Sequence, residues 1–388
     1  MTTQDTDVRV ADPRVLAALD EAGRRGDNTV QVAAYLDGEL IIDVAAGELA
    51  PGRPATPRTL YPVFSVTKAI TSVALHIQAE RGLVRYDDPV ATYWPAFGRH
   101  GKEAMTVADL LSHRGGIPWM PEGVTLEQQT DWDWMVRQIE ETRPAFAPGT
   151  TNCYHALIWG WAVGEIVRRT DPGERDFRTF LAEELLTPLG IGDVYFGLPE
   201  AEDERLATLT GGSVPDGASD YYLRGMPPAV FPGAEIYNTE LSRRSMNPGA
   251  GVIARAEGVA RFFALLAGMG ELNGTRLLSE ERVRSFTTPR DGTDEIDEFI
   301  GRAWRLSRHG FHLAGPGTLL GDNPNIIHHP GAGGAIGWAE LDSGLAVAIN
   351  HDAMHAGPPP LDEHPFAPVV AAVREVAAEL SGASAATR

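Results

Sequence analysis

The alternation of apolar and polar positions predicts strands near both ends of the chain and helices between them. Residues 29–49 (TVQVAAYLDGELIIDVAAGEL) form two strand-like runs around Asp37-Gly38, a dipeptide typical of a two-residue hairpin turn. Residues 335–350 (AIGWAELDSGLAVAIN) predict a second hairpin that turns at residues 342–344. We therefore expect one sheet that takes its strands from both chain ends.

The middle of the chain has helical periodicity. Apolar residues recur at helical spacing in residues 13–26, 65–81, 106–118, 132–141, 155–169, 257–270 and 366–380. Residues 199–248 are rich in Pro, Gly and charge and have weak periodicity, which predicts a long excursion over the surface. The tail 381–388 (SGASAATR) is expected to be disordered.

These patterns predict two structural units. Residues 1–84 and 245–388 are expected to form an α/β sheet domain built from both termini. Residues 85–244 are expected to form a mainly helical domain, with a lid-like loop at 199–244.

Composition excludes several classes of function. The net charge of -20 repels phosphate backbones, so nucleic acid is not an expected partner. No run of about 18 apolar residues predicts a membrane span, and the N-terminus lacks the features of a signal peptide. The single cysteine, Cys153, rules out an internal disulfide and, with scattered histidines, argues against a structural zinc site. Together these features predict a cytoplasmic protein.

One serine and one lysine form the first candidate catalytic pair. The chain has only two lysines, Lys68 and Lys102, although Lys and Arg together number 33. Lys68 follows Ser65 by three residues in an apolar helical run, a spacing that places both side chains on one face. A serine nucleophile needs a base, and a lysine can be that base when burial lowers its pKa, whereas arginine stays charged. Alone, the same spacing also occurs as a helix start followed by a solvated charge.

The S-x-x-K pattern is the nucleophile motif of class A β-lactamases and penicillin-binding proteins. The segments 64–97, 105–118, 148–171 and 328–354 resemble, in order, the serine β-lactamase-like superfamily, nearest to class C β-lactamases and family VIII carboxylesterases. The likeness runs from about residue 28 to residue 353. It implies an α/β (α+β) fold of the β-lactamase/transpeptidase type, with a central antiparallel sheet flanked by helices and an inserted all-helical region.

The resemblance places Tyr154, five residues after Gly149, in the second motif of that superfamily. A phenol held near amine or ammonium groups loses its proton more readily and can shuttle it. His155 and Ala156 follow, so the Asn of the β-lactamase form Y-x-N is missing, which favours the esterase branch. The structural alternative is a buried tyrosine with one hydrogen bond.

The third motif, K-T-G in β-lactamases, is matched here by His329-Pro330-Gly331. The resemblance implies that His329 orients Tyr154 or a substrate oxygen and that Gly331 lets the substrate approach the strand. It also implies an oxyanion hole made by the backbone N–H groups of Ser65 and Ala332. Adjacent strand residues face opposite sides, so either His329 or His328 faces the site, and the alignment favours His329.

Other conspicuous residues have structural interpretations. His113 is expected to cap a helix end. Five tryptophans could line an acyl pocket, although most are expected in the core: Trp119, Trp132, Trp134, Trp159 and Trp161.

The sequence therefore predicts a serine hydrolase that cleaves carboxylic esters through an acyl-enzyme on Ser65, with Lys68 and Tyr154 sharing the proton transfers. No metal or organic cofactor is expected, the partner is a small-molecule ester or acyl substrate, and the oligomeric state stays open. One alternative is an acyltransferase that passes the acyl group to an alcohol or amine of a biosynthetic product. A D-amino-acid amidase, peptidase or weak β-lactamase is disfavoured by the absent K-T-G and Y-x-N. A scaffold protein on an inactive hydrolase fold should have lost Ser65, Lys68 or Tyr154. All three are present, which disfavours this alternative.

Overall fold

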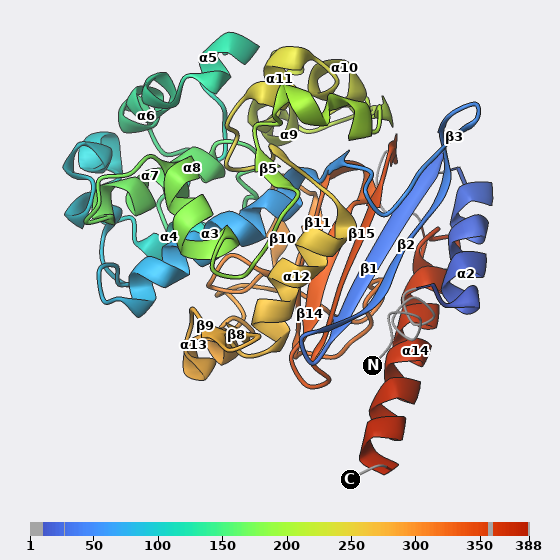
Figure 1. Cartoon of the computed structure of the whole chain (residues 1–388). Coiled ribbons are helices and arrows are strands. Elements are labelled where there is room, and N and C mark those ends of the chain that lie inside the picture. Colours follow the sequence, from blue (N-terminus) through green and yellow to red (C-terminus); the bar gives the residue numbers. More distant parts are fainter. Residues whose placement is uncertain (1–10, 27, 356–359, 387–388) are drawn as a thin grey trace.

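A seven-stranded antiparallel sheet forms the centre of the computed structural model, which describes residues 11–26, 28–355 and 360–386. The strand order is β12-β13-β14-β15-β1-β2-β3, so strands from both chain ends lie side by side (Figure 1). This confirms the predicted sheet and the α/β fold class. The strands are β1 (Thr29–Leu36), β2 (Glu39–Ala50), β3 (Arg53–Pro54), β12 (His312–Leu313), β13 (Ile326–Pro330), β14 (Ile336–Glu340) and β15 (Leu345–His351).

Both predicted hairpins are present. Asp37 and Gly38 join β1 to β2 with φ of 50° and 80°, the left-handed pair that a tight hairpin turn requires. β14 and β15 pair from Ile336↔Ile349 to Glu340↔Leu345. All eight residues of β1 are buried, because this central strand is covered on both faces.

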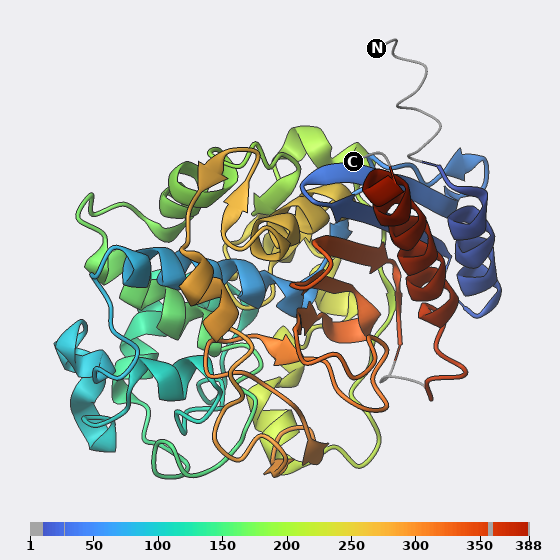
Figure 2. The same cartoon turned by 90° about the horizontal axis from the view of Figure 1, so that it is seen from below.

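Helices cover the two faces of the sheet. On one face lie α2 (Pro13–Arg24) and α14 (Ala367–Ala386), which pack against each other (Figure 2). On the other face α12 (Ala256–Ala267) packs on β1, β14 and β15. Helix α3 (Thr67–Glu80) also lies on the side of α12. It begins just after the short strand β4 (Tyr61–Pro62).

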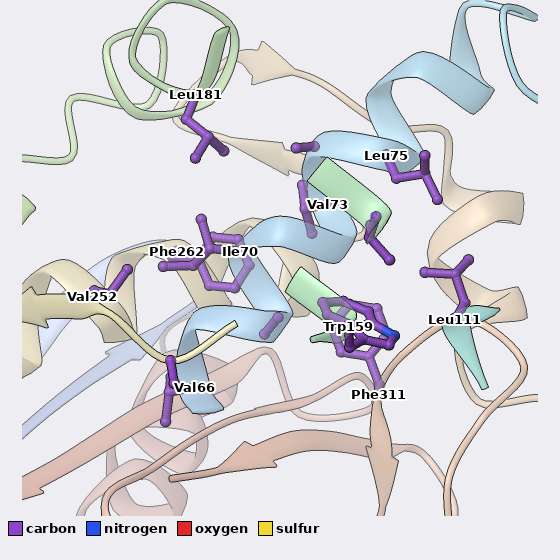
Figure 3. Packing of buried hydrophobic residues seen from close by; sticks show 14 of the residues in the cluster. Val66, Ile70, Val73, Leu75, Leu111, Trp159, Leu181, Val252, Phe262 and Phe311 are labelled. Carbon is purple, nitrogen blue, oxygen red and sulfur yellow. The ribbon is translucent and has the colours of Figure 1, made fainter. Parts of the chain in front are cut away.

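Helix α3 is the central element of the helical side of the molecule. It packs against α7 (Trp159–Thr170), and Figure 3 shows Ile70 and Val73 near Trp159 and Phe262. Residues of α3, α7 and α12 belong to one apolar cluster that runs from the sheet into the helices. The division into a sheet domain and a helical domain therefore stays a prediction.

The other helices between β3 and β12 are short. They are α4 (Val107–Leu111), α5 (Leu126–Thr130), α6 (Trp132–Glu141), α8 (Phe177–Leu181), α9 (Asp220–Gly225), α10 (Ala234–Tyr237), α11 (Glu240–Arg244) and α13 (Glu280–Ser285). A small sheet of order β4-β7-β5 joins β4 to β7 (Val252–Ala254) and β5 (Val194–Phe196). Paired short strands complete the fold: β6 (Thr210–Gly211) with β16 (Ala353–Met354), β8 (Glu271–Leu272) with β9 (Thr275–Arg276), and β10 (Ile296–Asp297) with β11 (Arg302–Ala303).

Two predictions about local order need correction. The segment 199–244, predicted as a loop, contains α9, α10 and α11, of which α9 and α11 start at the side-chain caps Ser219 and Thr239. Helices of four to six residues are too short to leave a periodic pattern. The tail 381–388 was predicted to be disordered, but helix α14 extends through it to Ala386, because alanine favours the helix. Residues 387–388 lie outside the described residues. Within the described ranges, no helix is long and apolar enough to cross a membrane.

Candidate active site

Ser65 lies in the 3-10 turn η1 (Phe64–Val66), between β4 and α3. Phe64 has φ of 48°, a left-handed conformation that is costly for an aromatic residue and that recurs at functional sites. The Phe64 ring is held by the ring of Tyr237, with centroids 4.7 Å apart. The turn leaves Ser65 half-buried, whereas Phe64 and Val66 are buried. Ser65 is thus the residue of this turn that a ligand can reach.

The amine of Lys68 contacts the hydroxyl of Ser65. Lys68 lies in the first turn of α3 and is fully buried, and its Nζ is 3.1 Å from Ser65 Oγ. Nζ also donates to the carbonyl oxygens of Ala156, at 2.7 Å, and Gly249, at 2.8 Å. Burial lowers the pKa of Lys68 well below its usual value. A neutral amine has two N–H donors and one lone pair, so the two carbonyls occupy the donors and the lone pair remains for the Ser65 O–H.

The motif departure at Ala156 is part of this geometry. In the Y-x-N form an Asn side chain would stand where Ala156 has only a methyl group. Here the backbone oxygen of Ala156 takes the hydrogen bond from Lys68. Among the described residues the lysine therefore has carbonyl partners and no carboxylate partner, which favours its neutral form.

Tyr154 completes a triangle with these two residues. It is 5 % exposed, its side chain lies beside Ser65, and its ring centroid lies 5.1 Å from Lys68 Nζ. Burial is the main cause that raises the pKa of Tyr154. Burial thus opposes ionisation of this phenol, and its part in proton transfer stays a prediction. In the resting site Tyr154 is a protonated phenol that can donate.

The sheet register decides between the two adjacent histidines. His329 pairs with Gly337 on the face covered by α12, whereas His328 pairs with Trp338, which belongs to the core beneath α14. His329 is fully buried, and its Nδ1 lies 2.9 Å from the oxygen of Pro330. That oxygen can only accept, so Nδ1 carries the proton and Nε2 is an acceptor without a partner among the described residues. Burial also lowers the pKa of His329 well below its usual value, so the ring is neutral.

Strand β13 runs close to the backbone that precedes Ser65. A Cβ at Gly331 would lie 2.4 Å from the oxygen of Val63, so only glycine fits there. Ala332 follows in the short turn η7 (Ala332–Gly334). None of the hydrogen bonds among the described residues uses the backbone N–H of Ser65 or of Ala332. Two unused donors therefore lie on backbone segments that touch each other.

Aromatic residues that the sequence did not single out surround Tyr154. Its ring centroid lies 5.0 Å from that of Trp304 and 5.8 Å from that of Phe299. His113, expected as a structural residue, has φ of 60° and accepts the Cys153 N–H through its carbonyl, and its ring lies 4.4 Å from that of Tyr154. In the sequence, the only feature that could have drawn attention to Trp304 and Phe299 is that they are two aromatic residues in a polar segment.

Two of the five tryptophans considered for an acyl pocket lie in the core. Trp159 and Trp161 are fully buried in the core. Trp119 is partly buried, its ring centroid lies 5.6 Å from that of Tyr221, and the guanidinium of Arg224 lies over its ring. Across the described parts of the chain, no group of three or more His, Cys, Asp or Glu side chains is arranged to hold a metal ion.

Comparison with known proteins places these motifs in one family. The sequence model of the Beta-lactamase family matches residues 14–371. The chain is 30% identical to the protein named Esterase/beta-lactamase LipL of Mycobacterium tuberculosis, over 94% of this chain and 86% of that protein.

Two solved structures extend the likeness to the fold. A family VIII carboxylesterase superposes with a TM-score of 0.84 at 30% identity, covering 95% of this chain and 98% of that one. A penicillin-binding protein homologue from Caulobacter crescentus superposes with a TM-score of 0.81 at 27% identity, with coverage of 95% and 98%.

Proposed function

The chain belongs to the β-lactamase family, and within that family we propose that it is a serine esterase that forms its acyl-enzyme on Ser65. The observation that carries the proposal is the environment of Lys68. Its amine is fully buried, its N–H donors are used by two carbonyl oxygens, and Ser65 Oγ lies 3.1 Å away. A buried neutral amine beside a serine hydroxyl is a general base ready for nucleophilic attack.

Acylation follows from this arrangement. Ser65 Oγ attacks the ester carbonyl carbon while its proton passes to Lys68, and the carbonyl oxygen becomes an oxyanion. The N–H groups of Ser65 and Ala332 stabilise that oxyanion, and losing one such donor typically costs roughly 3 to 4 kcal/mol. Tyr154 donates its proton to the departing alkoxide oxygen as the bond to the acyl carbon breaks, and the phenolate takes back the proton that Lys68 had accepted from Ser65.

Deacylation repeats these steps with water as the nucleophile. Water gives a proton to the phenol–amine pair as it attacks the acyl carbon, and the same two N–H groups stabilise the second oxyanion. Collapse of the intermediate releases the carboxylic acid and returns the proton to Ser65. The proposed cycle thus leaves Lys68 neutral and Tyr154 protonated, which is their resting state.

The charge of the site supports neutral esters as substrates. His329 occupies the position of the lysine of K-T-G, and burial keeps its ring neutral with an accepting Nε2. Lys68 is neutral for the same reason. A site without a permanent cation gives a substrate carboxylate no partner, so β-lactams, whose ring carries a carboxylate, are disfavoured. The name of one relative, a family VIII carboxylesterase, is consistent with this preference, whereas the name of the other, an esterase/β-lactamase, includes both activities.

The proposal is tested by intact-mass measurement of the protein after incubation with a p-nitrophenyl short-chain ester or with a fluorophosphonate. We expect one covalent adduct and ester turnover with wild type, and neither with Ser65→Ala. Ser72→Ala is the matched control, because it removes a buried hydroxyl further along α3 and should keep adduct and turnover.

Two other results of this experiment would change the proposal. Absence of adduct and turnover with both probes would overturn the esterase proposal. An adduct that forms on Ser65 but is released only when an alcohol or amine is added would replace water by another acyl acceptor and make the enzyme an acyltransferase.

A further inference from the structure

A buried carboxylate holds the backbone of Tyr154. Oδ1 of Asp297 accepts hydrogen bonds from the N–H of Tyr154 at 3.0 Å, of Phe299 at 3.1 Å and of Ile300 at 3.3 Å. The side chain of Asp297 is fully buried. One oxygen atom therefore fixes Tyr154 against a segment more than 140 residues away in sequence.

Arg290 holds the other oxygen of this carboxylate. Its Nη2 lies 3.2 Å from Asp297 Oδ2, and both side chains have no exposed surface. The same guanidinium donates to the carbonyl oxygens of Ser112, at 2.8 Å, and Trp304, at 3.2 Å. Removing two charges from water is costly, so such a pair is weak evidence for stability and better evidence for a fixed geometry. Here the pair connects the backbone before His113 with the segment that carries Trp304.

The segment 290–304 also touches the ring of Tyr154. Phe299 and Trp304 both pack on that ring, with centroids 5.8 Å and 5.0 Å away. Two residues before Tyr154, the side-chain amide of Asn152 donates to the carbonyl oxygen of Gly292, within the same segment. The segment 290–304 thus contacts both the backbone and the ring of Tyr154. Within this segment, Asp297 accepts the hydrogen bond from the Tyr154 backbone.

We propose that Asp297, held in place by Arg290, is a positioning residue that sets the hydroxyl of Tyr154 against Ser65. The inference rests on the proposed function, because the placement of Tyr154 limits the rate only if this phenol transfers a proton. A displacement of the order of 1 Å at such a group can cost about 100-fold in rate. Asp297 does not touch the reacting atoms and acts through the backbone of Tyr154.

Double substitutions at Asp297 and Arg290 distinguish the hydrogen-bond acceptor of Asp297 from the charges of the two side chains. Asp297→Asn with Arg290→Gln keeps an accepting Oδ1 and removes both charges together. Asp297→Ala with Arg290→Gln has the same net charge and removes the acceptor. We expect the first double variant to keep kcat within about 3-fold of wild type, and the second to lose about 30-fold in kcat with KM within about 3-fold. The measurement is steady-state hydrolysis of an ethyl ester, whose alkoxide leaving group needs the proton of Tyr154, by samples whose thermal unfolding shows a folded protein.

A second measurement asks whether the effect passes through the phenol. In a Tyr154→Phe background there is no hydroxyl to position, so the Asp297→Ala change should add less than about 3-fold to the loss in kcat/KM for the ethyl ester. If the acceptor-free pair does not fold, Asp297→Glu replaces it. This variant keeps the charge pair, moves the oxygen by about one methylene group, and should lower kcat about 10-fold or more.

Asp171→Asn is the matched control. Asp171 is buried, pairs with the partly exposed Arg175, accepts its backbone N–H at 3.0 Å, and lies beyond the far end of α7. It should lower the melting temperature and leave kcat of the folded protein unchanged.

The outcomes distinguish the two proposals. Wild type that neither turns over ester nor forms an adduct overturns the proposed function and the positioning role with it. An active wild type whose acceptor-free variants are folded and keep kcat within about 3-fold overturns the positioning role alone. If Asp297→Ala causes equal losses in kcat/KM for the ethyl ester with and without the hydroxyl of Tyr154, Asp297 is a structural residue only.

Discussion

The amine of Lys68 lies 3.1 Å from the hydroxyl of Ser65 and makes its other two hydrogen bonds to backbone carbonyl oxygens. Carbonyl oxygens accept hydrogen bonds without adding a full negative charge, so they orient the amine without holding a proton on it. Burial then decides its ionisation, and the pKa of Lys68 is lowered. This relationship explains why a chain rich in arginine has a lysine here, and it leads to the following predictions.

Lys68→Arg should abolish esterase activity in a folded protein. The guanidinium does not release its proton in proteins, so it cannot accept the proton of Ser65, and general-base catalysis is worth about 100- to 10,000-fold. The measurement is kcat/KM with a p-nitrophenyl ester. Lys102→Arg is the matched control, because Lys102 is also fully buried and donates to the carbonyl oxygens of Glu140 and Thr142. Equal losses for both variants would contradict the base role.

The lowered pKa of Lys68 also predicts how stability depends on pH. The unfolded chain binds a proton at this lysine below its ordinary pKa of about 10.4, whereas the folded chain does not until the pH falls below the lowered value. Between these two values the unfolded state binds more protons, so the free energy of unfolding rises with pH. Replacement by methionine removes this dependence. Urea unfolding of wild type and Lys68→Met between pH 7 and about 10 should show wild type gaining stability relative to the variant.

Tyr154→Phe should impair alkyl esters more than p-nitrophenyl esters. A p-nitrophenolate leaves without a proton, whereas an alkoxide needs one from the phenol, and this donation is worth about 100-fold or more. The phenyl ring still fills the space between His113 and Trp304, so the fold should be kept. The ratio of kcat/KM for an ethyl and a p-nitrophenyl ester of the same acid reports the difference. Tyr237→Phe, another buried tyrosine near the turn, should leave that ratio unchanged.

Gly331→Ala should separate β13 from the turn that carries Ser65. The new Cβ would lie 2.4 Å from the oxygen of Val63, so one backbone has to move, at a cost of about 1 to 3 kcal/mol in stability. The oxyanion donors then lose their spacing, and kcat should fall about 100-fold or more. Gly192→Ala, where an added Cβ meets nothing within 4 Å, is the control for both the melting temperature and kcat. An active, stable Gly331→Ala would contradict the close approach.

The part of the site that depends on local spacing could be predicted from the sequence. Ser65 and Lys68 are three residues apart on one helical turn, and the alternation of β13 limited the choice to His328 or His329. The position of Asp297 could not be predicted, because its three hydrogen bonds need a loop to fold back onto Tyr154 from far along the chain. Its partner Arg290 is an arginine among many in the sequence, and only tertiary packing makes it a buried one.

The fold was predicted to a similar extent. Hairpin turns and long amphipathic helices follow from local residue patterns, and these were found. No local pattern predicts the pairing of β1 with β15. It was expected only because strands are predicted near both ends of the chain and one sheet can contain all of them. The short helices α9, α10 and α11 were missed because caps and tertiary contacts, rather than periodicity, define them.

The central position of β1 has a consequence for how the protein is made. On the ribosome β15, the partner of β1, is synthesised roughly 300 residues after β1, and at about 5 to 20 residues per second this delay is roughly 15 to 60 s. Ser65 and Lys68 are present throughout this interval, whereas Ala332 is among the last parts of the site to be translated. The proposed nucleophile is therefore translated long before the proposed oxyanion hole, and we expect the nascent chain to be inactive until Ala332 and β15 have emerged.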